Sequence, residues 1–191
     1  MMAFATKRQL RDHLKRQRQQ LSAVQRHHFD ALIMSKILAL PEVVNARCIF
    51  CFISMADEVD THHLIRDLQR QNKIIVVPKT LPDGKMVAVL FSSWQELETD
   101  SFGIQVPPSS APYQDKIDVC LTPGLGFSPS GHRLGYGRGY YDGWFAANNV
   151  GDKIGIGYDC QVLAEIPVDE TDVPVDKIVT EKQIYHVRSR C

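Results

Sequence analysis

Residues 121–145, which read LTPGLGFSPSGHRLGYGRGYYDGWF, concentrate the residue types that bind phosphate. Six of the chain's 12 glycines lie between residues 121 and 142, and Gly143 follows them. Glycines leave backbone N–H groups open to a ligand, and arginines offer paired donors to phosphate oxygens. An aspartate on the first turn of a following helix could hold a metal ion. The side chains that suit such a site are Arg133, Arg138, Tyr136, Tyr140, Tyr141 and Asp142. The stretch therefore predicts a phosphate site.

The pattern differs from the common phosphate-binding loops. A Walker A loop needs G-x-x-x-x-G-K-[ST], and the chain contains no Gly-Lys-Ser or Gly-Lys-Thr. Residues 135–139 read G-x-G-x-G, whereas the dinucleotide fingerprint is G-x-G-x-x-G. Glycine content alone is equally typical of a mobile surface loop. The arginines, tyrosines and aspartate within ten residues favour a ligand site instead.

The stretch resembles a known family signature. Residues 123–127, PGLGF, followed by Gly131 and by residues 133–142, RLGYGRGYYD, resemble the signature of 5-formyltetrahydrofolate cyclo-ligases, also called methenyltetrahydrofolate synthetases. The resemblance extends to residues 7–11, 54–58 and 168–179. It departs at two positions, because Arg138 stands where the family usually has lysine and Ser128 stands where aspartate is common. Arginine keeps the charge but changes the donor geometry. The role of Ser128 stays open.

The resemblance implies a reaction and a set of site residues. The reaction is ATP- and Mg²⁺-dependent conversion of 5-formyltetrahydrofolate, with or without a polyglutamate tail, to 5,10-methenyltetrahydrofolate, through a phosphorylated formyl group. Catalytic roles are implied for Arg138 and Tyr141, and Mg²⁺ ligation for Asp142 and Asp172. The implied ATP contacts are Lys7, Arg8, Gln9, Leu10, Arg11, Arg133, Leu134, Gly135, Tyr136, Gly137, Arg138, Gly139, Tyr140 and Tyr141. The implied folate contacts are Arg11, Ile53, Glu58 on the pterin ring, Tyr136, Gly137, Arg138, Gly139 and Tyr140.

Several of these residues have simpler interpretations from the residues alone. Lys7 and Arg11 share a helix face, which is more often a solvated basic face than a binding site. Glu58 could merely favour the N-terminus of the next helix. Asp172 lies in an acidic segment that would otherwise be a surface turn. Two possible metal or redox pairs are discounted. His62 and His63 are adjacent on a predicted helix, so their side chains diverge, and Cys48 and Cys51 are three apart on a predicted strand, so they point to opposite faces.

The remaining elements must position these residues. A helix capped by Thr6 is expected to bury Leu10, Leu14 and Leu21, and a capping box of Ser22 and Gln25 opens a second helix that ends at Pro41. A third helix is predicted from a Thr61 cap to about residue 72, a helical turn at 94–97, and a fourth helix over 140–148. Residues 82–85 predict a turn and residues 103–113 a loop. Strands are predicted at 47–54, 73–78, 86–91, 117–121, 153–158 and 177–180.

Strands that alternate with helices predict an α/β fold, here a single three-layer α/β/α domain over residues 1–191. The resemblance implies a mixed sheet like that of sugar-phosphate isomerases and CoA transferases, but the strand order does not follow from the sequence. The 22 basic and 22 acidic residues give no bias toward nucleic acid or membrane. No apolar run of 18 residues or secretory signal is evident. Five scattered cysteines indicate reduced thiols and a cytoplasmic protein, which we expect to be a monomer.

Two other functions stay open at this point. The first is another small-molecule ATP-dependent ligase or kinase on the same scaffold. The second is a non-catalytic nucleic-acid-binding module, with the basic N-terminal helix on phosphates and the tyrosines of the glycine-rich stretch on bases. The neutral total charge and the absence of a known nucleic-acid-binding motif weigh against the second.

Overall fold

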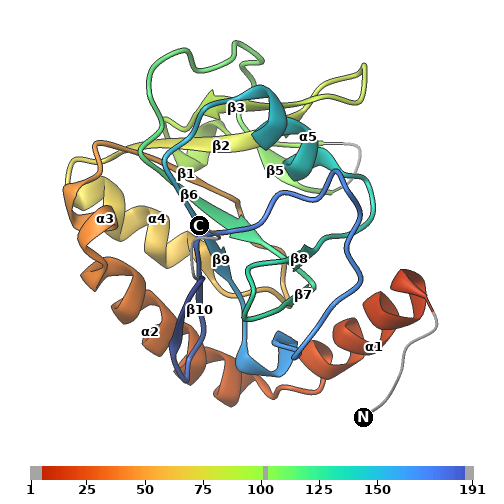
Figure 1. Cartoon of the computed structure of the whole chain (residues 1–191). Helices are drawn as coiled ribbons and strands as arrows, with labels where there is room; N and C mark the ends of the chain where they lie inside the picture. Colours follow the sequence, from red (N-terminus) through yellow and green to blue (C-terminus); the bar gives the residue numbers. More distant parts are fainter. Residues whose placement is uncertain (1–5, 101–102, 188–191) are drawn as a thin grey trace.

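A seven-stranded mixed sheet forms the centre of the computed structural model, which describes residues 6–100 and 103–187 (Figure 1). The strand order is β11-β10-β9-β6-β1-β2-β3. The five inner strands are parallel, and β3 and β11 pair antiparallel at the two edges. The bounds are β1 (Cys48–Cys51), β2 (Ile74–Thr80), β3 (Met86–Leu90), β6 (Val119–Pro123), β9 (Asp152–Ile156), β10 (Lys177–Val179) and β11 (Ile184–His186). The mixed α/β architecture is confirmed.

Helices cover both faces of the sheet, which gives three layers. In Figure 1, α2 (Ala23–Ala39), α3 (Pro41–Asn45) and α4 (Thr61–Arg70) lie on one side and α5 (Tyr140–Ala147) on the other. Successive β1 side chains alternate between these layers, as the strand period requires. Cys51 packs in the apolar cluster of α2 and α4, whereas Cys48 packs in the cluster of Trp144 and Phe145. The predicted divergence of the two cysteines is therefore confirmed, and both are free thiols.

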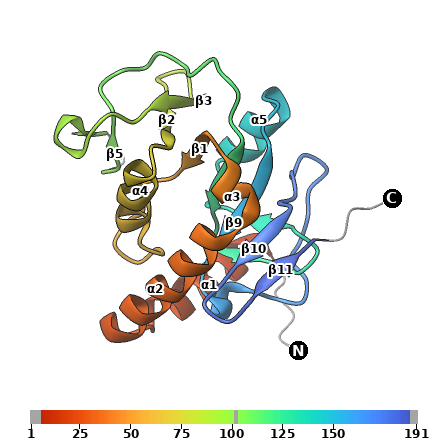
Figure 2. The same ribbon diagram turned by 90° about the vertical axis from the view of Figure 1, so that its left-hand side faces the viewer.

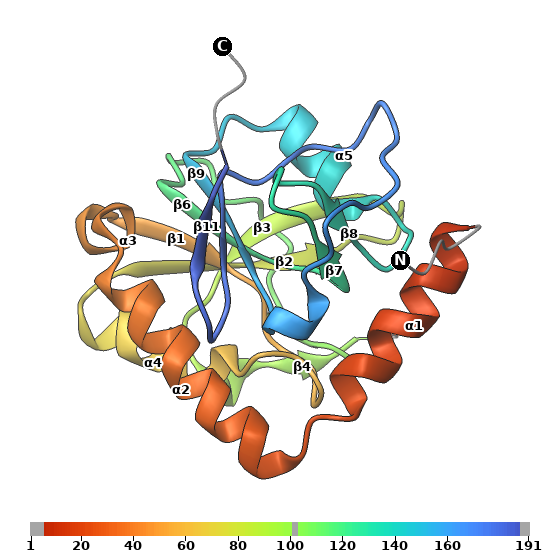
Figure 3. The ribbon, with the colours of Figure 1, turned by 60° about the horizontal axis from the view of Figure 1, so that its bottom comes forward.

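The N-terminal helices begin where the sequence predicts. The Thr6 hydroxyl accepts the N–H of Gln9 at the start of α1 (Lys7–Gln19), and Ser22 and Gln25 form the capping box of α2. Figure 3 shows α1 directed away from α2, along the 3₁₀ segment η2 (Asp159–Gln161). Figure 2 shows α2 passing beside the β10–β11 hairpin, where the Lys36 ammonium donates to the Thr180 carbonyl at 2.8 Å. Between residues 6 and 187, leaving out 101–102, no helix is long and apolar enough to cross a bilayer.

Two local predictions are corrected and two are confirmed. Asp60, not Thr61, caps α4, because its carboxylate accepts the backbone N–H groups of His62 and His63. The Thr61 hydroxyl instead donates to the Phe52 carbonyl at 2.7 Å and holds the chain that leaves β1. The segment predicted as loop carries β5 (Gln105–Val106), which pairs with β4 (Glu98–Thr99). The helical turn predicted near residue 94 is present as η1 (Trp94–Glu96), and Gly84 lies in the predicted 82–85 turn with a φ of +80°.

The glycine-rich stretch is not a simple link between a strand and a helix. It contains a small hairpin of β7 (Gly126–Phe127) and β8 (Arg133–Leu134) before α5 begins. A Cβ at Gly126 would lie 2.5 Å from Leu14 Cδ1, so glycine lets α1 pack directly on the hairpin. Leu134 packs with Leu10, Leu14 and Ile166 in the same contact. The hairpin thereby fixes α1 beside the end of β6.

The sheet reverses its winding between β1 and β6. From β1 the chain continues to β2 on one side, and from β6 it continues to β9 on the other, while β1 and β6 are neighbours. Ligands of open α/β sheets bind in the crevice outside the carboxyl ends of the strands at such a point. Residues just after Cys51 and just after Pro123 are therefore brought together by topology.

Candidate active site

A cavity of about 690 Å³ lies at this reversal point. Its walls come from α1, from the segments after β1 and β6, and from residues 169–172. Most of the predicted site residues line it: Lys7, Arg11, Ile53, Glu58, Arg133, Leu134, Gly135, Tyr136, Gly137, Arg138, Gly139, Tyr140, Tyr141, Asp142 and Asp172. Arg8 and Gln9 are exposed on α1, Leu10 is buried in the core, and none of the three lines the cavity. Their contact with ATP stays a prediction.

Three carboxylates and two cations form one cluster in this cavity. Arg133 Nη2 lies 2.9 Å from Asp142 Oδ1, which also accepts the Val173 N–H at 3.2 Å. The Lys7 ammonium donates to Asp172 Oδ2 at 3.0 Å and to Asp169 Oδ2 at 2.6 Å. Because Val173 follows Asp172, the contact between Asp142 and Val173 places the two predicted metal ligands side by side in the fold.

At Lys7 and Asp172, neighbouring groups outweigh the effect of burial on the pKa. Burial alone would raise the pKa of Asp172, but the Asp169 N–H and the Lys7 ammonium outweigh it and lower the pKa. Burial alone would lower the pKa of Lys7, but its bonds to Asp169 and Asp172 raise it. Lys7 therefore pairs with Asp172 and Asp169, and Arg133 pairs with Asp142.

The donor set fits Mg²⁺ held together with a nucleotide. Among residues 6–100 and 103–187, no group of three or more His, Cys, Asp or Glu side chains is arranged to hold a metal ion. Mg²⁺ is usually held by one or two carboxylates, several waters and the phosphates of a substrate. Asp142 and Asp172 supply that number of carboxylates. A site that is completed by substrate phosphates accords with their arrangement, whereas a closed all-protein metal site does not.

Arg133 and Tyr141 lie against each other beside this cluster. The Arg133 guanidinium carbon is 5.1 Å from the centre of the Tyr141 ring, and the arginine side chain is only 3% exposed. Within the described part of the chain, its Nε has no hydrogen-bond partner. Burial raises the pKa of Tyr141 well above its usual value, so the hydroxyl remains a donor at neutral pH. Both residues can therefore donate to an anionic ligand.

The loop from Gly135 to Gly139 is shaped around Arg11. Arg11 Nε donates to the Gly135 carbonyl at 2.9 Å. Gly137 has a φ of +99°, and a Cβ there would lie 3.2 Å from Arg11 Cζ. Gly139, with a φ of +67°, is the N-cap of α5. The first backbone N–H groups of a helix lack intrahelical partners and favour anions. The loop thus presents α5 and an arginine to the cavity together.

Glu58 is held by three neighbours, Tyr136, Met55 and Arg18. Its Oε1 accepts the Tyr136 hydroxyl at 2.6 Å, and its Oε2 accepts the Met55 N–H at 2.9 Å. Arg18 Nη1 lies 3.7 Å from Oε1. The Glu58 side chain is only 6% exposed and lines the cavity, so it offers a negative acceptor where water is largely excluded.

Comparison with known proteins identifies the family. The model of the 5-formyltetrahydrofolate cyclo-ligase family matches residues 3–181. The chain belongs to this family. The resemblance seen in the glycine-rich stretch is thereby confirmed.

Named relatives agree with this assignment. The mouse 5-formyltetrahydrofolate cyclo-ligase is 32% identical, over 93% of this chain and 94% of its own. The cyclo-ligase of Escherichia coli strain K12 is 28% identical, over 90% of this chain and 98% of its own. The NMR structure of Aquifex aeolicus 5,10-methenyltetrahydrofolate synthetase superimposes with a TM-score of 0.83 at 29% identity, covering 97% of this chain and 94% of that chain.

The two departures from the cyclo-ligase signature lie in different surroundings. Arg138 is exposed and lines the cavity. Ser128 is fully buried in the β7–β8 hairpin, where its hydroxyl is 2.8 Å from that of Ser130. Ser128 does not line the cavity. The hydroxyl pair therefore belongs to the turn that carries Arg133.

Sequence reasoning missed Asp169, which pairs with Lys7 in the cavity, and Arg18, which touches the cavity wall. Arg18 contacts Glu58, Asp57 and Tyr136, yet only its charge is evident from the sequence. A signal does exist, because residues four apart share a helix face. Leu10, Leu14 and Arg18 form one such row, and all three are buried. A basic residue in an apolar row indicates a buried ionic partner elsewhere in the fold.

Proposed function

We propose that this chain catalyses the ATP- and Mg²⁺-dependent closure of 5-formyltetrahydrofolate to 5,10-methenyltetrahydrofolate, with release of ADP and phosphate. The main support is that one cavity, where the sheet reverses its winding between β1 and β6, holds two different kinds of group. One is Glu58, a largely desolvated hydrogen-bond acceptor, and the other is the charged cluster of Lys7, Arg133, Asp142 and Asp172. The first suits the N–H groups of a pterin ring, and the second suits a nucleotide's phosphates. Family membership supports the same reaction.

The chemistry explains why both parts are needed. A formamide oxygen is a poor leaving group, so it first accepts the γ-phosphoryl group while ADP leaves. N10 of the folate then attacks the formyl carbon, which closes the ring. Phosphate departs with the former formyl oxygen, and N10 loses its proton. The protein needs no nucleophile of its own, because its task is to align the groups and neutralise charge on the phosphoryl group.

Each residue has a role in this scheme. Lys7, Arg11, Arg133 and Arg138 bind phosphate oxygens, and Tyr141 donates a hydrogen bond from its protonated hydroxyl. Glu58 accepts N–H groups of the pterin. Asp142 and Asp172 would hold Mg²⁺, which supplies positive charge to the phosphate oxygens when bound. The backbone of residues 135–139 leaves room for the ligand because three of its five residues are glycines.

We further infer that the protein acts as a cytoplasmic monomer on folate, with or without a polyglutamate tail, and not on nucleic acid or membrane. The four cysteines in the described part of the chain are all free thiols, which is typical of a reducing compartment. The equal numbers of basic and acidic residues support a small-molecule partner.

The test is the growth of methenyl absorbance in a mixture of purified protein, 5-formyltetrahydrofolate, ATP and Mg²⁺. Product should form only when all are present, and excess EDTA should stop it. ADP formation without methenyl product would favour another ligase or kinase. Salt-dependent oligonucleotide binding without turnover would favour the nucleic-acid module.

A further inference from the structure

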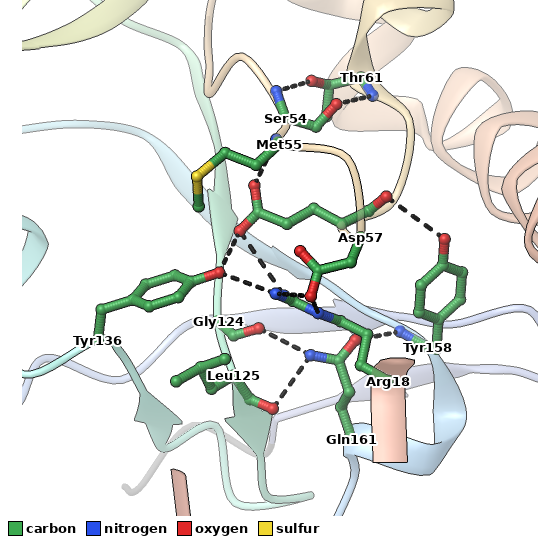
Figure 4. A network of polar contacts seen from close by, with 11 residues as sticks. Arg18, Ser54, Met55, Asp57, Thr61, Gly124, Leu125, Tyr136, Tyr158 and Gln161 are labelled. Atoms are coloured by element: carbon green, nitrogen blue, oxygen red, sulfur yellow. Dashed lines mark hydrogen bonds and ion pairs between the residues drawn. The ribbon is translucent and has the colours of Figure 1, made fainter. Parts of the chain in front are cut away.

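Arg18 is a buried cation that lies outside the cavity but touches its wall. Its side chain is 2% exposed, and it comes from the last turn of α1. Arg18 Nη2 is 2.9 Å from Asp57 Oδ2 and 3.1 Å from the Tyr136 hydroxyl oxygen, and Nη1 is 3.7 Å from Glu58 Oε1. Glu58 and Tyr136 line the cavity, whereas Arg18 does not. Figure 4 shows the guanidinium between Asp57 and the Tyr136 hydroxyl.

The guanidinium fixes the direction of the hydrogen bonds around it. Arginine donates hydrogen bonds and cannot accept them. The Tyr136 hydroxyl therefore accepts from Arg18 and gives its own proton to Glu58 Oε1, 2.6 Å away. In this series of hydrogen bonds, from Arg18 to Tyr136 to Glu58, the Glu58 carboxylate can only accept. A carboxylate has about four acceptor positions, and the hydrogen bonds from Tyr136 and Met55 use two of them. The others remain for the N–H groups of a ligand.

Charge supports the same conclusion. Asp57 and Glu58 are adjacent carboxylates, and Glu58 is nearly buried. On its other side, the Tyr158 hydroxyl lies 3.4 Å from the Glu58 backbone carbonyl and donates to Asp30 of α2 at 2.7 Å. Arg18 supplies positive charge to the carboxylates of both Asp57 and Glu58. Without that charge, two neighbouring carboxylates would face each other in a partly desolvated space.

We propose that Arg18 is a positioning residue for the folate: through Tyr136 and Asp57 it orients Glu58 as an acceptor for the two N–H donors on the pyrimidine edge of the pterin. The proposal rests on the proposed function, because it takes the pterin as the ligand of Glu58. It assigns Arg18 no contact with the substrate. This role would explain why Arg18, a basic residue, stands in the buried row of α1 with Leu10 and Leu14.

A double-mutant cycle tests this role. The affinity for 5-formyltetrahydrofolate and, separately, for MgATP is measured by titration calorimetry for the wild type, R18M, R18K, E58Q and R18M/E58Q. R16M is the matched control, because Arg16 is an exposed arginine on the same helix. R18M should weaken folate binding about tenfold or more and change MgATP binding less than about twofold, and R18K should recover part of the loss. In the E58Q background, R18M should change folate binding less than about twofold, because contacting residues couple.

Each other outcome contradicts the proposal. Wild-type folate affinity in R18M would remove Arg18 from the site. An equal loss of folate and MgATP affinity, or full additivity with E58Q, would show a merely structural role. If R18M does not fold, R18K and R18K/E58Q complete the same cycle. A wild type that neither binds folate nor forms methenyl product refutes the proposed function itself, whereas normal wild-type turnover with an unaffected R18M refutes only the role of Arg18.

Discussion

Replacing Gly137 with alanine tests how the glycine-rich loop serves the site. Its φ of +99° is a conformation that other residues rarely adopt, and such strain costs about 1–3 kcal/mol of the free energy of unfolding. At about 2–4 °C per kcal/mol, Tm should fall by about 2–12 °C. The new Cβ would also lie 3.2 Å from Arg11 Cζ, closer than ordinary contact. The end of the Arg11 side chain must then move by a few tenths of an ångström, which disturbs its 2.9 Å bond to the Gly135 carbonyl. A hydrogen bond from Arg11 to an ATP phosphate would contribute about 1.5–3 kcal/mol, so a displaced Arg11 should lower MgATP affinity by about ten- to hundredfold.

Gly84→Ala is the matched control for this prediction. Gly84 has a φ of +80° in the β2–β3 turn, but no atom lies within 4 Å of its added Cβ, and it does not line the cavity. Thermal unfolding, calorimetric MgATP titration and turnover are measured for both variants. Both should lose similar stability, and only Gly137→Ala should lose nucleotide affinity. Wild-type affinity and turnover in Gly137→Ala, or equal loss of affinity in Gly84→Ala, would refute the reasoning.

Three further predictions concern single charged side chains. Arg138→Lys should retain turnover within about tenfold, because a point charge remains, whereas Arg138→Ala should lose considerably more, in kcat rather than in the KM for folate; equal damage from both would mean that the fork geometry matters. Glu58→Gln should weaken folate binding by about 1.5–3 kcal/mol and spare MgATP; the reverse pattern in calorimetry would contradict its assignment. The Lys116 ammonium, ahead of the Cys48 N–H, lowers the pKa of Asp118 to about 2. Its folded pKa is below its unfolded value, so the stability that Asp118→Asn removes should be full above about pH 5 and should shrink steadily as the pH falls from about 4 through about 2. Urea unfolding across this range measures it, and a difference that stays undiminished at pH 2 would contradict the ion pair.

Short-range features could be predicted from the sequence because their physics is local. The Thr6 cap and the box of Ser22 and Gln25 need only neighbouring residues, and both form. The alternation of a strand likewise places Cys48 and Cys51 on opposite faces. Sequence reasoning assigns the cap of α4 to Thr61 instead of Asp60 because both residue types are good N-caps and they are adjacent in the sequence. Local propensity does not decide which of the two side chains caps the helix in the folded protein.

Features that depend on distant partners could not be predicted in this way. The strand order depends on pairings between segments far apart in the chain, and the β7–β8 hairpin forms where Leu14 of α1 packs on Gly126. In the sequence, Arg18 is one of many basic residues, and its role becomes visible only in the fold, where it contacts Asp57 and Tyr136. The candidates in the glycine-rich stretch came from residue types, and the roles of Lys7, Glu58 and Asp172 came from the family resemblance. The pairing of Lys7 with Asp172 and of Arg133 with Asp142 comes only from the structure.

The most direct test of the central claim follows the formyl oxygen. If the γ-phosphoryl group is transferred to that oxygen before the ring closes, 5-formyltetrahydrofolate labelled with ¹⁸O in the formyl group must deliver its label to the released phosphate. Mass spectrometry of the phosphate after turnover in unlabelled water should show one ¹⁸O atom per methenyl product formed. Unlabelled phosphate, with the label recovered in water, would mean that ATP hydrolysis and ring closure are separate events and would contradict the mechanism.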